Sequence, residues 1–444
     1  MISPRKGLIN RDYTRLWGGQ AVSTVGDYVF DTTLTLWVAT EVLKGKSWAP
    51  LAVSGVLLAV GAAVLLVGPV AGVFVDRWSH KKIMLHSELV RAALVAVLML
   101  LSLLPLHALP VGVWLTCIYL TVFVLNAAGQ FFSPARFAAV GGIVPGEADR
   151  ARAAGIGQAT TGVAAILGPP LAAPLLFSVG VQWAMALNLI SYLCSYALIR
   201  SVRFPEPEES STVAPGTGSA ARRWRQEFVT GLRYFAGNRL LVALLASAVI
   251  TQIGTGALNT LNVFFATGTL HASARQFGFV SMAFGVGAIV GALVAGRVVG
   301  RIGARTATWL GLVIAGALVC VYSRQSDFVV AIVVLMLVAV PVATLNTAMT
   351  PLLLESTPPE YLGRVVAVFN PINELAAMVS AAVAGWLASS AMAGFGGHFA
   401  GMTFGPVDTI FAVSGIMIII AGCYAAMALP RERAVAPVPV EVSV

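Results

Sequence analysis

The sequence predicts an all-α membrane protein, with twelve transmembrane helices in two six-helix bundles related by pseudo-two-fold symmetry. Three observations lead to this prediction: an apolar composition, twelve long uncharged runs, and a repeat that relates the two halves. Of the 444 residues, 58% are hydrophobic and 11% are charged, and the mean hydropathy is +0.86. One water-soluble core could not hide so much apolar surface, so a bilayer is the expected solvent.

The twelve runs are long enough to cross the hydrocarbon core, which needs about 20 residues each. Length and lack of charge, rather than periodicity, distinguish them from the buried helices of a soluble protein. They lie near residues 15–40, 50–75, 83–104, 111–133, 151–177, 181–200, 239–262, 276–299, 304–323, 327–350, 364–390 and 408–429. No cleavable signal peptide is expected, because residues 1–15 are polar and the following run is too long for a signal-peptide core.

One copy of the repeat lies between the second and third predicted helices, and the other copy lies between the eighth and ninth. The segment GVFVDRWSHKK at residues 72–82 returns 224 residues later as GRVVGRIGART. The same register aligns Gly61 with Gly285 and Lys81 with Arg305. Because the offset is about half the chain, we interpret the protein as two homologous halves. In membrane proteins built from two parallel repeats, the functional site lies where the repeats meet.

The domain organisation follows from the runs and from the segment between the halves. We expect a first bundle at residues 1–202, a linker at 203–238, a second bundle at 239–430 and a short tail at 431–444. The linker is rich in Pro, Glu, Ser and Gly, a composition that cannot bury itself. Near its end, Phe228, Leu232 and Phe235 alternate with charged residues, which predicts a short amphipathic helix at the membrane surface.

Positive charge predicts the orientation. If both termini are cytoplasmic, the cytoplasmic segments hold 24 of the 28 Lys and Arg residues. This asymmetry follows the positive-inside rule and explains the net charge of +9. The basic residues are scattered among loops, so no nucleic acid partner is expected. Arg outnumbers Lys 23 to 5, and Ala, Gly and Val are abundant, which suggests the cytoplasmic (inner) membrane of a high-GC bacterium.

Carboxylates within the predicted helices are the strongest chemical signal. Asp27 and Asp31 are four residues apart and share one face of the first helix, and Glu374 is midway along the eleventh. A charge at the bilayer centre costs about 2.5 to 3.5 kcal/mol, so these residues are candidates for proton coupling. Alternatively, Asp31 is solvated near the external surface and Asp27 bonds a neighbouring helix. Glu88 and Arg91 instead predict a structural ion pair.

Further polar side chains fall where a central cavity needs them. Amides in a bundle core also join helices, so each residue has this second interpretation. The candidates for cavity lining are Gln20, Tyr28, Asn126, Gln130, Gln252, Asn259, Asn262, Asn346, Asn370 and Asn373.

The loop after the second helix carries Gly72, Asp76, Arg77 and Lys81 in the pattern G-x-x-x-D-R-x-x-x-K. Together with the two repeats, it resembles the major facilitator superfamily over residues 12–431. Ser79 and His80 depart from the family pattern Gly-x-Leu-Ala-Asp-Arg-x-Gly-Arg-Lys. The resemblance implies that Asp76 latches the loop against the start of the eleventh helix in the outward-open state. The second copy has Gly300 at this position, so the latch is asymmetric.

The fifth helix carries Gly168 and Pro169 within AAILGPPLAA, residues 164–173, which is similar to the antiporter motif Gly-x-x-x-Gly-Pro-x-x-Gly-Gly. With FSPAR at residues 132–136 and VPGE at 144–147, the chain resembles the drug-and-proton antiporter branch that includes macrolide exporters and an enterobactin exporter. The Arg that other drug-antiporter branches carry in the fourth helix is missing, since residues 111–133 contain no basic side chain.

These resemblances imply a secondary active transporter that exports a hydrophobic or amphipathic, drug-like small molecule in exchange for protons by alternating access. The alternatives are an exporter or flippase for a lysolipid or a siderophore, and a transporter-like membrane sensor without turnover. The expected partners are the small-molecule substrate, protons and the lipid bilayer, and we expect a monomer. No enzyme activity, cofactor or metal is expected, because no nucleotide loop, His/Cys ligand cluster or nucleophile arrangement occurs.

Overall fold

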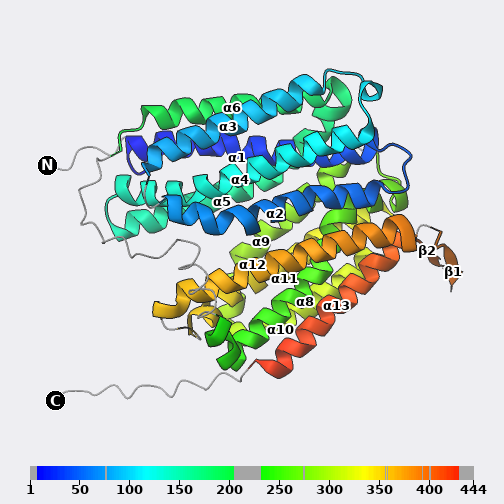
Figure 1. Cartoon of the computed structure of the whole chain (residues 1–444). Helices are drawn as coiled ribbons and strands as arrows, with labels where there is room; N and C mark the ends of the chain where they lie inside the picture. The colour runs from blue at the N-terminus through cyan, green and yellow to red at the C-terminus, as the bar shows by residue number, and fades with distance from the viewer. Residues whose placement is uncertain are drawn as a thin grey trace, which may run out of the picture.

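The computed structural model describes residues 8–75, 78–204, 232–273, 276–355, 357, 359–392, 394–399 and 402–429. Within these ranges the molecule consists of long helices running side by side (Figure 1). The long helices are α1 (Arg11–Trp37), α2 (Ala49–Val75), α3 (His80–Leu101), α4 (Val111–Ile143), α5 (Glu147–Pro174), α6 (Val181–Ser201), α8 (Arg239–Phe264), α9 (Phe277–Ile302), α10 (Ala304–Tyr322), α11 (Phe328–Glu355), α12 (Pro359–Trp386) and α13 (Pro406–Ala428).

Eleven of these helices are long and apolar enough to cross a membrane. The exception, α1, contains Arg11, Asp12, Arg15, Asp27 and Asp31. The predicted all-α membrane fold is confirmed, and the first helix, which carries two of the candidate coupling residues, is also the least apolar.

The end of α4 was predicted wrongly. The prediction ended the helix at residue 133, next to Pro134 and Arg136, but α4 continues to Ile143. Ala135, Ala139 and Ile143 on the extension are buried in a cluster with residues of α1 and α3. Tertiary packing therefore outweighs the local helix-breaking signal of the proline.

Within the described part of the chain, four helices end in a π-helical turn, and these turns reveal the internal symmetry. They are η1 (Val38–Val42) after α1, η3 (Leu175–Val179) after α5, η4 (Phe265–Thr269) after α8 and η6 (Leu387–Ala391) after α12. The first and fifth helices of each half therefore end in the same way. All four turns lie at one end of the molecule, which we call the distal end. The opposite end, where α1 begins, we call the terminal end.

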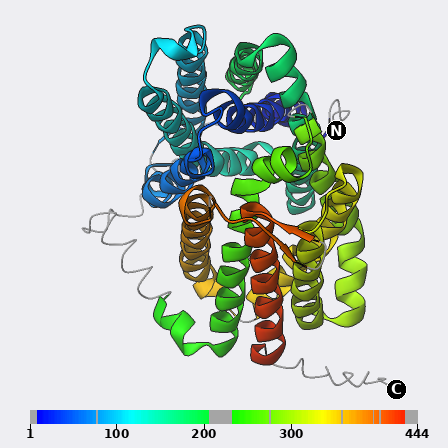
Figure 2. The same ribbon diagram turned by 90° about the vertical axis from the view of Figure 1, so that its right-hand side faces the viewer.

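Viewed from the distal end, the helices form two groups (Figure 2). In the first group α1 packs on α5 and α6, α4 on α2 and α3, and α3 on α6. In the second, α8 packs on α12 and α13, α11 on α9 and α10, and α10 on α13. Each pair in one group has its counterpart in the other, so the six-helix repeat predicted from residues 72–82 is present as two similarly packed bundles.

Two matched side chains tie the third helix of each half to the end of the sixth. Lys81 Nζ donates hydrogen bonds to the carbonyl oxygens of Arg200 (2.9 Å) and Val202 (2.7 Å). Arg305 donates to the carbonyl oxygens of Leu429 (2.7 Å) and Ala426 (2.6 Å). Cations suit these positions, because the last carbonyls of a helix lack partners within the helix.

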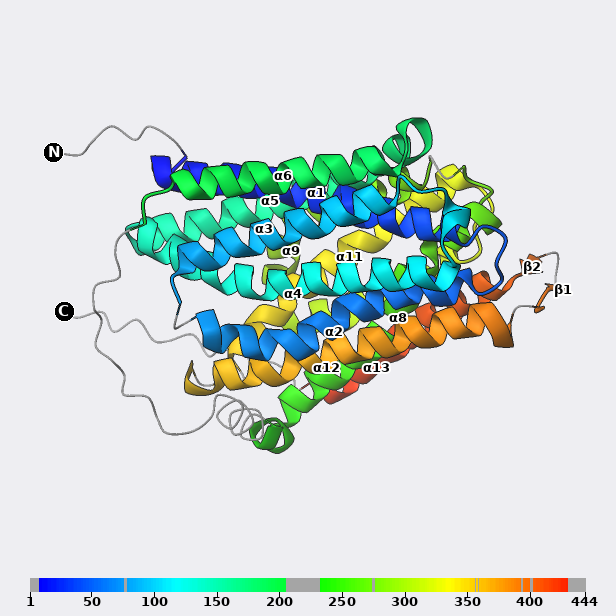
Figure 3. The ribbon, with the colours of Figure 1, turned by 45° about the horizontal axis from the view of Figure 1, so that its top comes forward.

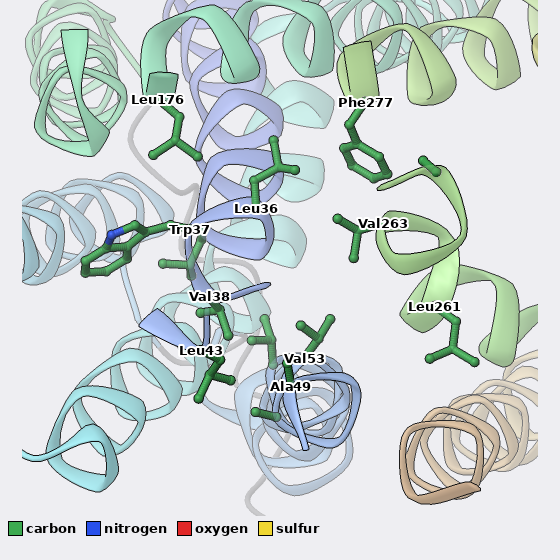
Figure 4. Packing of buried hydrophobic residues seen from close by; sticks show 14 of the residues in the cluster. Leu36, Trp37, Val38, Leu43, Ala49, Val53, Leu176, Leu261, Val263 and Phe277 are labelled. Atoms are coloured by element: carbon green, nitrogen blue, oxygen red, sulfur yellow. The ribbon is translucent and has the colours of Figure 1, made fainter. Parts of the chain in front are cut away.

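The halves meet along two pairs of helices, α2 with α12 (Figure 3) and α5 with α9. Near the distal end, a hydrophobic cluster joins them, with Trp37 and Val53 from the first half and Leu261 and Phe277 from the second (Figure 4). Toward the terminal end, the two groups diverge (Figure 1). Open space lies beside both α5 and α9 here, because a Cβ added to Gly157 of α5 or to Gly296 of α9 would meet no atom within 4 Å.

The distal end also carries a small element that the sequence did not predict. A two-stranded antiparallel hairpin, β1 (Gly397–Phe399) and β2 (Met402–Phe404), lies between η6 and α13. Residues 205–231 of the linker and 430–444 of the tail lie outside the described part of the chain. Of the predicted amphipathic segment, residues 232–237 are helical, and Phe235 is buried against Leu241 and Val368.

Candidate functional site

A cavity of about 1000 Å³ lies between the halves. The first half contributes only a few lining residues, among them Tyr28 and Thr32 of α1 and Pro169 of α5. Helices α8 to α13 supply most of the wall. The predicted lining residues on this second wall are Gln252, Asn259, Asn262, Asn346, Asn370 and Asn373.

The amides on this wall differ in how they are held. Tyr322 donates a hydrogen bond to Asn262 Oδ1 (2.7 Å), and Asn373 Nδ2 donates to the Phe369 carbonyl (3.0 Å). Asn259 and Asn346 have exposed side chains on the wall. The held amides give the site a fixed polar geometry, while the exposed ones are accessible to a bound molecule.

A stripe of hydroxyl groups on α8 was not among the predicted lining residues. Ser247, Thr251 and Thr255 line the cavity together with Asn259, each four residues after the last. Residues four apart lie on one helix face, so this spacing could have revealed the stripe. Thr255 also donates to Gln252 Oε1 (3.1 Å), which joins the stripe to a predicted lining residue.

Glu374 is the one charged side chain among the described residues that line the cavity. It is half-buried on α12, where that helix packs on α2, and a Cβ on Gly61 would lie 3.1 Å from Glu374 Oε1. A single carboxylate on a largely apolar wall favours a cation or a proton as its partner. Glu374 is therefore the coupling candidate that lies on the cavity wall.

Asp27 and Asp31 are not among the lining residues, although Tyr28 between them is. Asp27 faces α6, where the Tyr192 hydroxyl donates a hydrogen bond of 2.5 Å to its Oδ1. Asp31, one turn further along α1, has an exposed side chain. The two carboxylates therefore occupy different environments.

Three other predicted lining residues, Gln20, Asn126 and Gln130, lie away from the cavity wall. Gln20 Oε1 accepts a hydrogen bond of 2.9 Å from Arg136, and Asn126 Nδ2 donates to the Val122 carbonyl of its own helix (2.9 Å). Gln130 faces α2, where a Cβ on Gly68 would lie 3.2 Å from its Oε1. In this conformation these amides make contacts within the first half.

The antiporter-like motif lies at a crossing of three helices. A Cβ on Gly168 would lie 2.5 Å from the Cβ of Tyr28, so α5 can approach α1 this closely only with glycine. On the other side of α5, a Cβ on Gly278 of α9 would lie 2.6 Å from the Pro169 carbonyl oxygen. The motif therefore lies both on the cavity wall and at the contact between the halves.

The loop motif is only partly visible. Gly72 lies in α2 and Lys81 binds the end of α6, whereas Asp76 and Arg77 lie outside the described residues. The latch between Asp76 and the start of α12 stays a prediction.

Known proteins share both the sequence pattern and the fold. Macrolide efflux protein A of Streptococcus pyogenes is 26% identical over 369 residues, which cover 81% of this chain and 85% of that protein. The uncharacterized MFS-type transporter YkuC of Bacillus subtilis is 25% identical over 256 residues. That match covers 57% of this chain and 56% of YkuC, so the chain spans about half the length of this relative.

Solved structures show the same arrangement of helices. A bacterial homologue of the iron transporter ferroportin, in its inward-facing state, has a TM-score of 0.71 at 14% identity, covering 95% of this chain and 99% of that one. The peptide transporter POT has a TM-score of 0.70 at 13% identity and covers 96% of each chain. At such identities the likeness shows the fold alone.

The sequence profile of the Major Facilitator Superfamily matches residues 16–264 and 244–443, which together cover nearly the whole chain. This match agrees with the two packed bundles and with the cavity between them. The chain is a multi-pass membrane transporter that belongs to the major facilitator superfamily.

Proposed function

We propose that the protein exports an amphipathic small molecule from the cytoplasm in exchange for protons, by alternating access. The observation that carries this proposal is the cavity of about 1000 Å³ between the halves, with hydroxyls, amides and one carboxylate on a mostly apolar wall. Pockets of this size and character suit drug-sized ligands. The similarity to macrolide efflux protein A supports export as the direction of transport.

The positive-inside rule supports a cytoplasmic location for both termini and so for the terminal end. With this orientation, the distal end faces outward, where Trp37 and Phe277 belong to the cluster that joins the halves. The described conformation is then the inward-facing one. Rocking about the α2–α12 and α5–α9 contacts would close the terminal end and open the distal end.

Glu374 supports a more specific cargo, an amphipathic molecule that carries a basic amine. A protonated amine can pair with the carboxylate, while the rest of the molecule contacts apolar side chains such as Leu258 and Phe284. A cation and a proton then compete for Glu374. Asp27, which faces α6 instead, is free to bind the coupling proton without meeting the cargo.

We also propose that Asp76 acts as a latch against the start of α12. Asp76→Asn keeps the shape of the side chain but removes its charge, so transport should fall while insertion stays normal. Crosslinking between the end of α2 and the start of α12 tests the mechanism directly. An unchanged crosslinking profile in the variant would count against the latch.

An accumulation panel tests the overall function. In cells that lack their major exporters, expression should lower the accumulation of some lipophilic cations or macrolide-like compounds, and a protonophore should abolish the difference. Unchanged accumulation across the panel, with correctly inserted protein, would favour a lysolipid or siderophore exporter or flippase, or a membrane sensor.

A further inference from the structure

The interior of the first bundle contains two buried charged residues that the proposed function does not use. Glu88 and Arg91 on α3 are 1% and 9% exposed. The direct ion pair expected from their spacing is absent from the described part of the chain. Instead, Glu88 Oε2 and Arg91 Nε are buried without a hydrogen-bond partner among the described residues. Such orphaned atoms are costly in a protein interior, so they point to a function.

These residues belong to a group that extends to α1 and α6. Ser195 donates a hydrogen bond of 2.8 Å to Glu88 Oε1, and Tyr192 donates one of 2.5 Å to Asp27 Oδ1. The Arg91 guanidinium lies 5.7 Å from the centre of the Tyr192 ring. Arg91 thus contacts the side chain that bonds Asp27 and lies three residues from Glu88 on the same helix.

Phe132 of α4 closes the other side of this group, with its ring centre 5.1 Å from the Arg91 guanidinium. The ionisable groups that act on Glu88 are Arg91 and Asp27. Those that interact with Asp27 are Arg91 and Tyr192 and, on α1 itself, Tyr28 and Asp31, whose side chain is exposed. The part of α4 that faces the group presents Phe132 and Gly129, neither of which titrates.

Charge balance decides how many protons this group holds. It contains two carboxyl groups and one guanidinium, and arginine stays protonated in proteins. With both carboxyl groups ionised, the apolar interior would contain an uncompensated negative charge, which is strongly unfavourable. One added proton makes the group neutral.

We propose that Glu88 is a proton-binding site, and that Glu88 and Asp27 share one proton around Arg91. In the described conformation the proton is on Glu88, because its carboxyl group is almost fully buried and accepts a single hydrogen bond. Asp27 is only partly buried and accepts a short bond from Tyr192, which stabilises an ionised carboxylate.

The positions of the two carboxyl groups suit a relay. Their partners lie on α6, which ends at Ser201 at the terminal end, and Ser195, the partner of Glu88, comes after Tyr192, the partner of Asp27. Glu88 is therefore nearer the terminal end. When the proton moves from Asp27 to Glu88, one O–H bond breaks and another forms, Arg91 compensates whichever carboxylate is left, and the group stays neutral.

Infrared spectroscopy of the purified full-length protein tests the proton directly, through the C=O band of a protonated carboxyl group. Glu88→Gln should remove the intensity of one such group from the wild-type band. Asp27→Asn should remove it too, because Glu88 then ionises opposite Arg91. Glu374→Gln, which removes a carboxyl group from the other half, should not change this component. A band that persists unchanged in Glu88→Gln would overturn the proposal.

Two milder variants locate the proton and do not depend on the folding of Glu88→Gln. Ser195→Ala removes the hydrogen bond to Glu88 and should shift the band, whereas Tyr192→Phe should leave its position unchanged. The opposite result would place the proton on Asp27 and exclude Glu88 as its site in this conformation.

The relay role rests on the proposed proton coupling, whereas the protonation of Glu88 does not. In vesicles with an imposed pH gradient, Glu88→Gln should lower uphill export at least about tenfold and leave downhill exchange intact. Uphill export at the wild-type level would exclude Glu88 from the relay. If the wild type shows no proton-driven export, the proposed function fails, and the infrared result still decides the state of Glu88.

Discussion

The two halves share one architecture but place their polar residues differently. Both have the same helix pairs, the same π-helical turns after their first and fifth helices, and the same cationic contact between their third and sixth helices. The first half buries both Glu88 and Arg91 on α3, where they contact Ser195 and Tyr192 of α6. In the second half, Leu312 and Ala315 occupy the positions that correspond to Glu88 and Arg91 at the 224-residue offset.

This difference suggests that the two halves have different roles in transport. The second half supplies most of the cavity wall, including the hydroxyl stripe of α8 and Glu374. The first half contains Asp27, which is bonded within its own bundle and does not line the cavity. A repeat preserves the framework that rocks, and each copy can then specialise, one for the proton and the other for the cargo.

The largest expected effect concerns the proton-binding side of this comparison. Asp27→Asn cannot release a proton but still bonds Tyr192, so uphill export should fall at least about 100-fold while folding and downhill exchange persist. Reconstituted vesicles with an imposed pH gradient measure both. Asp31→Asn should be milder, because its side chain is exposed. Glu374→Gln, measured at saturating cargo, is the matched control because Glu374 is the coupling candidate of the other half. If Asp27→Asn still concentrates cargo normally, the coupling role is assigned to Glu374 instead.

The contact between the halves gives the next effect. Gly278→Val inserts a branched side chain against the Pro169 carbonyl, 2.6 Å from the new Cβ, and should destabilise the described conformation by about 1 to 3 kcal/mol. Gly296→Val, on the same helix, meets no atom within 4 Å and should be neutral. Thermal unfolding in detergent compares the two, and equal shifts would mean that α5 and α9 do not pack as described.

The cargo-binding side is tested with pairs of cationic and neutral compounds. Glu374→Gln removes the charge on the cavity wall, so the KM for an amine-bearing cargo should rise roughly tenfold, as expected for one charge-assisted hydrogen bond. A neutral analogue of the same shape should keep its KM. A similar rise for both compounds would assign Glu374 to packing or coupling rather than to recognition of charge.

The smallest effect tests the symmetry itself. Lys81→Met and Arg305→Met each remove two hydrogen bonds to helix-end carbonyls, and each should lower stability by about 1 kcal/mol. Thermal unfolding of the two single variants and of the double variant is the measurement. Because the residues lie in different bundles, their effects should add, and a strongly unequal pair would show that one half limits stability.

Local sequence was sufficient for the architecture. Long uncharged runs predict the membrane helices because a bilayer contains no water to bond the backbone, and the repeat at residues 72–82 and 296–306 predicts two bundles. The same reasoning located Glu374 and several cavity amides, since an unneeded polar group inside a membrane helix is expensive. It could not locate the end of α4, where packing of Ala139 and Ile143 outweighs the signal of Pro134.

The tertiary structure alone decided which polar residues face the cavity and which face their own bundle. Asp27 and Tyr28 are neighbours in sequence, yet Asp27 bonds Tyr192 of α6 and Tyr28 lines the cavity. Glu88 and Arg91 show the spacing of a surface ion pair but are buried beside an aromatic residue of α6. Helical periodicity states which residues share a face, but the identity of the neighbour depends on contacts between helices far apart in sequence.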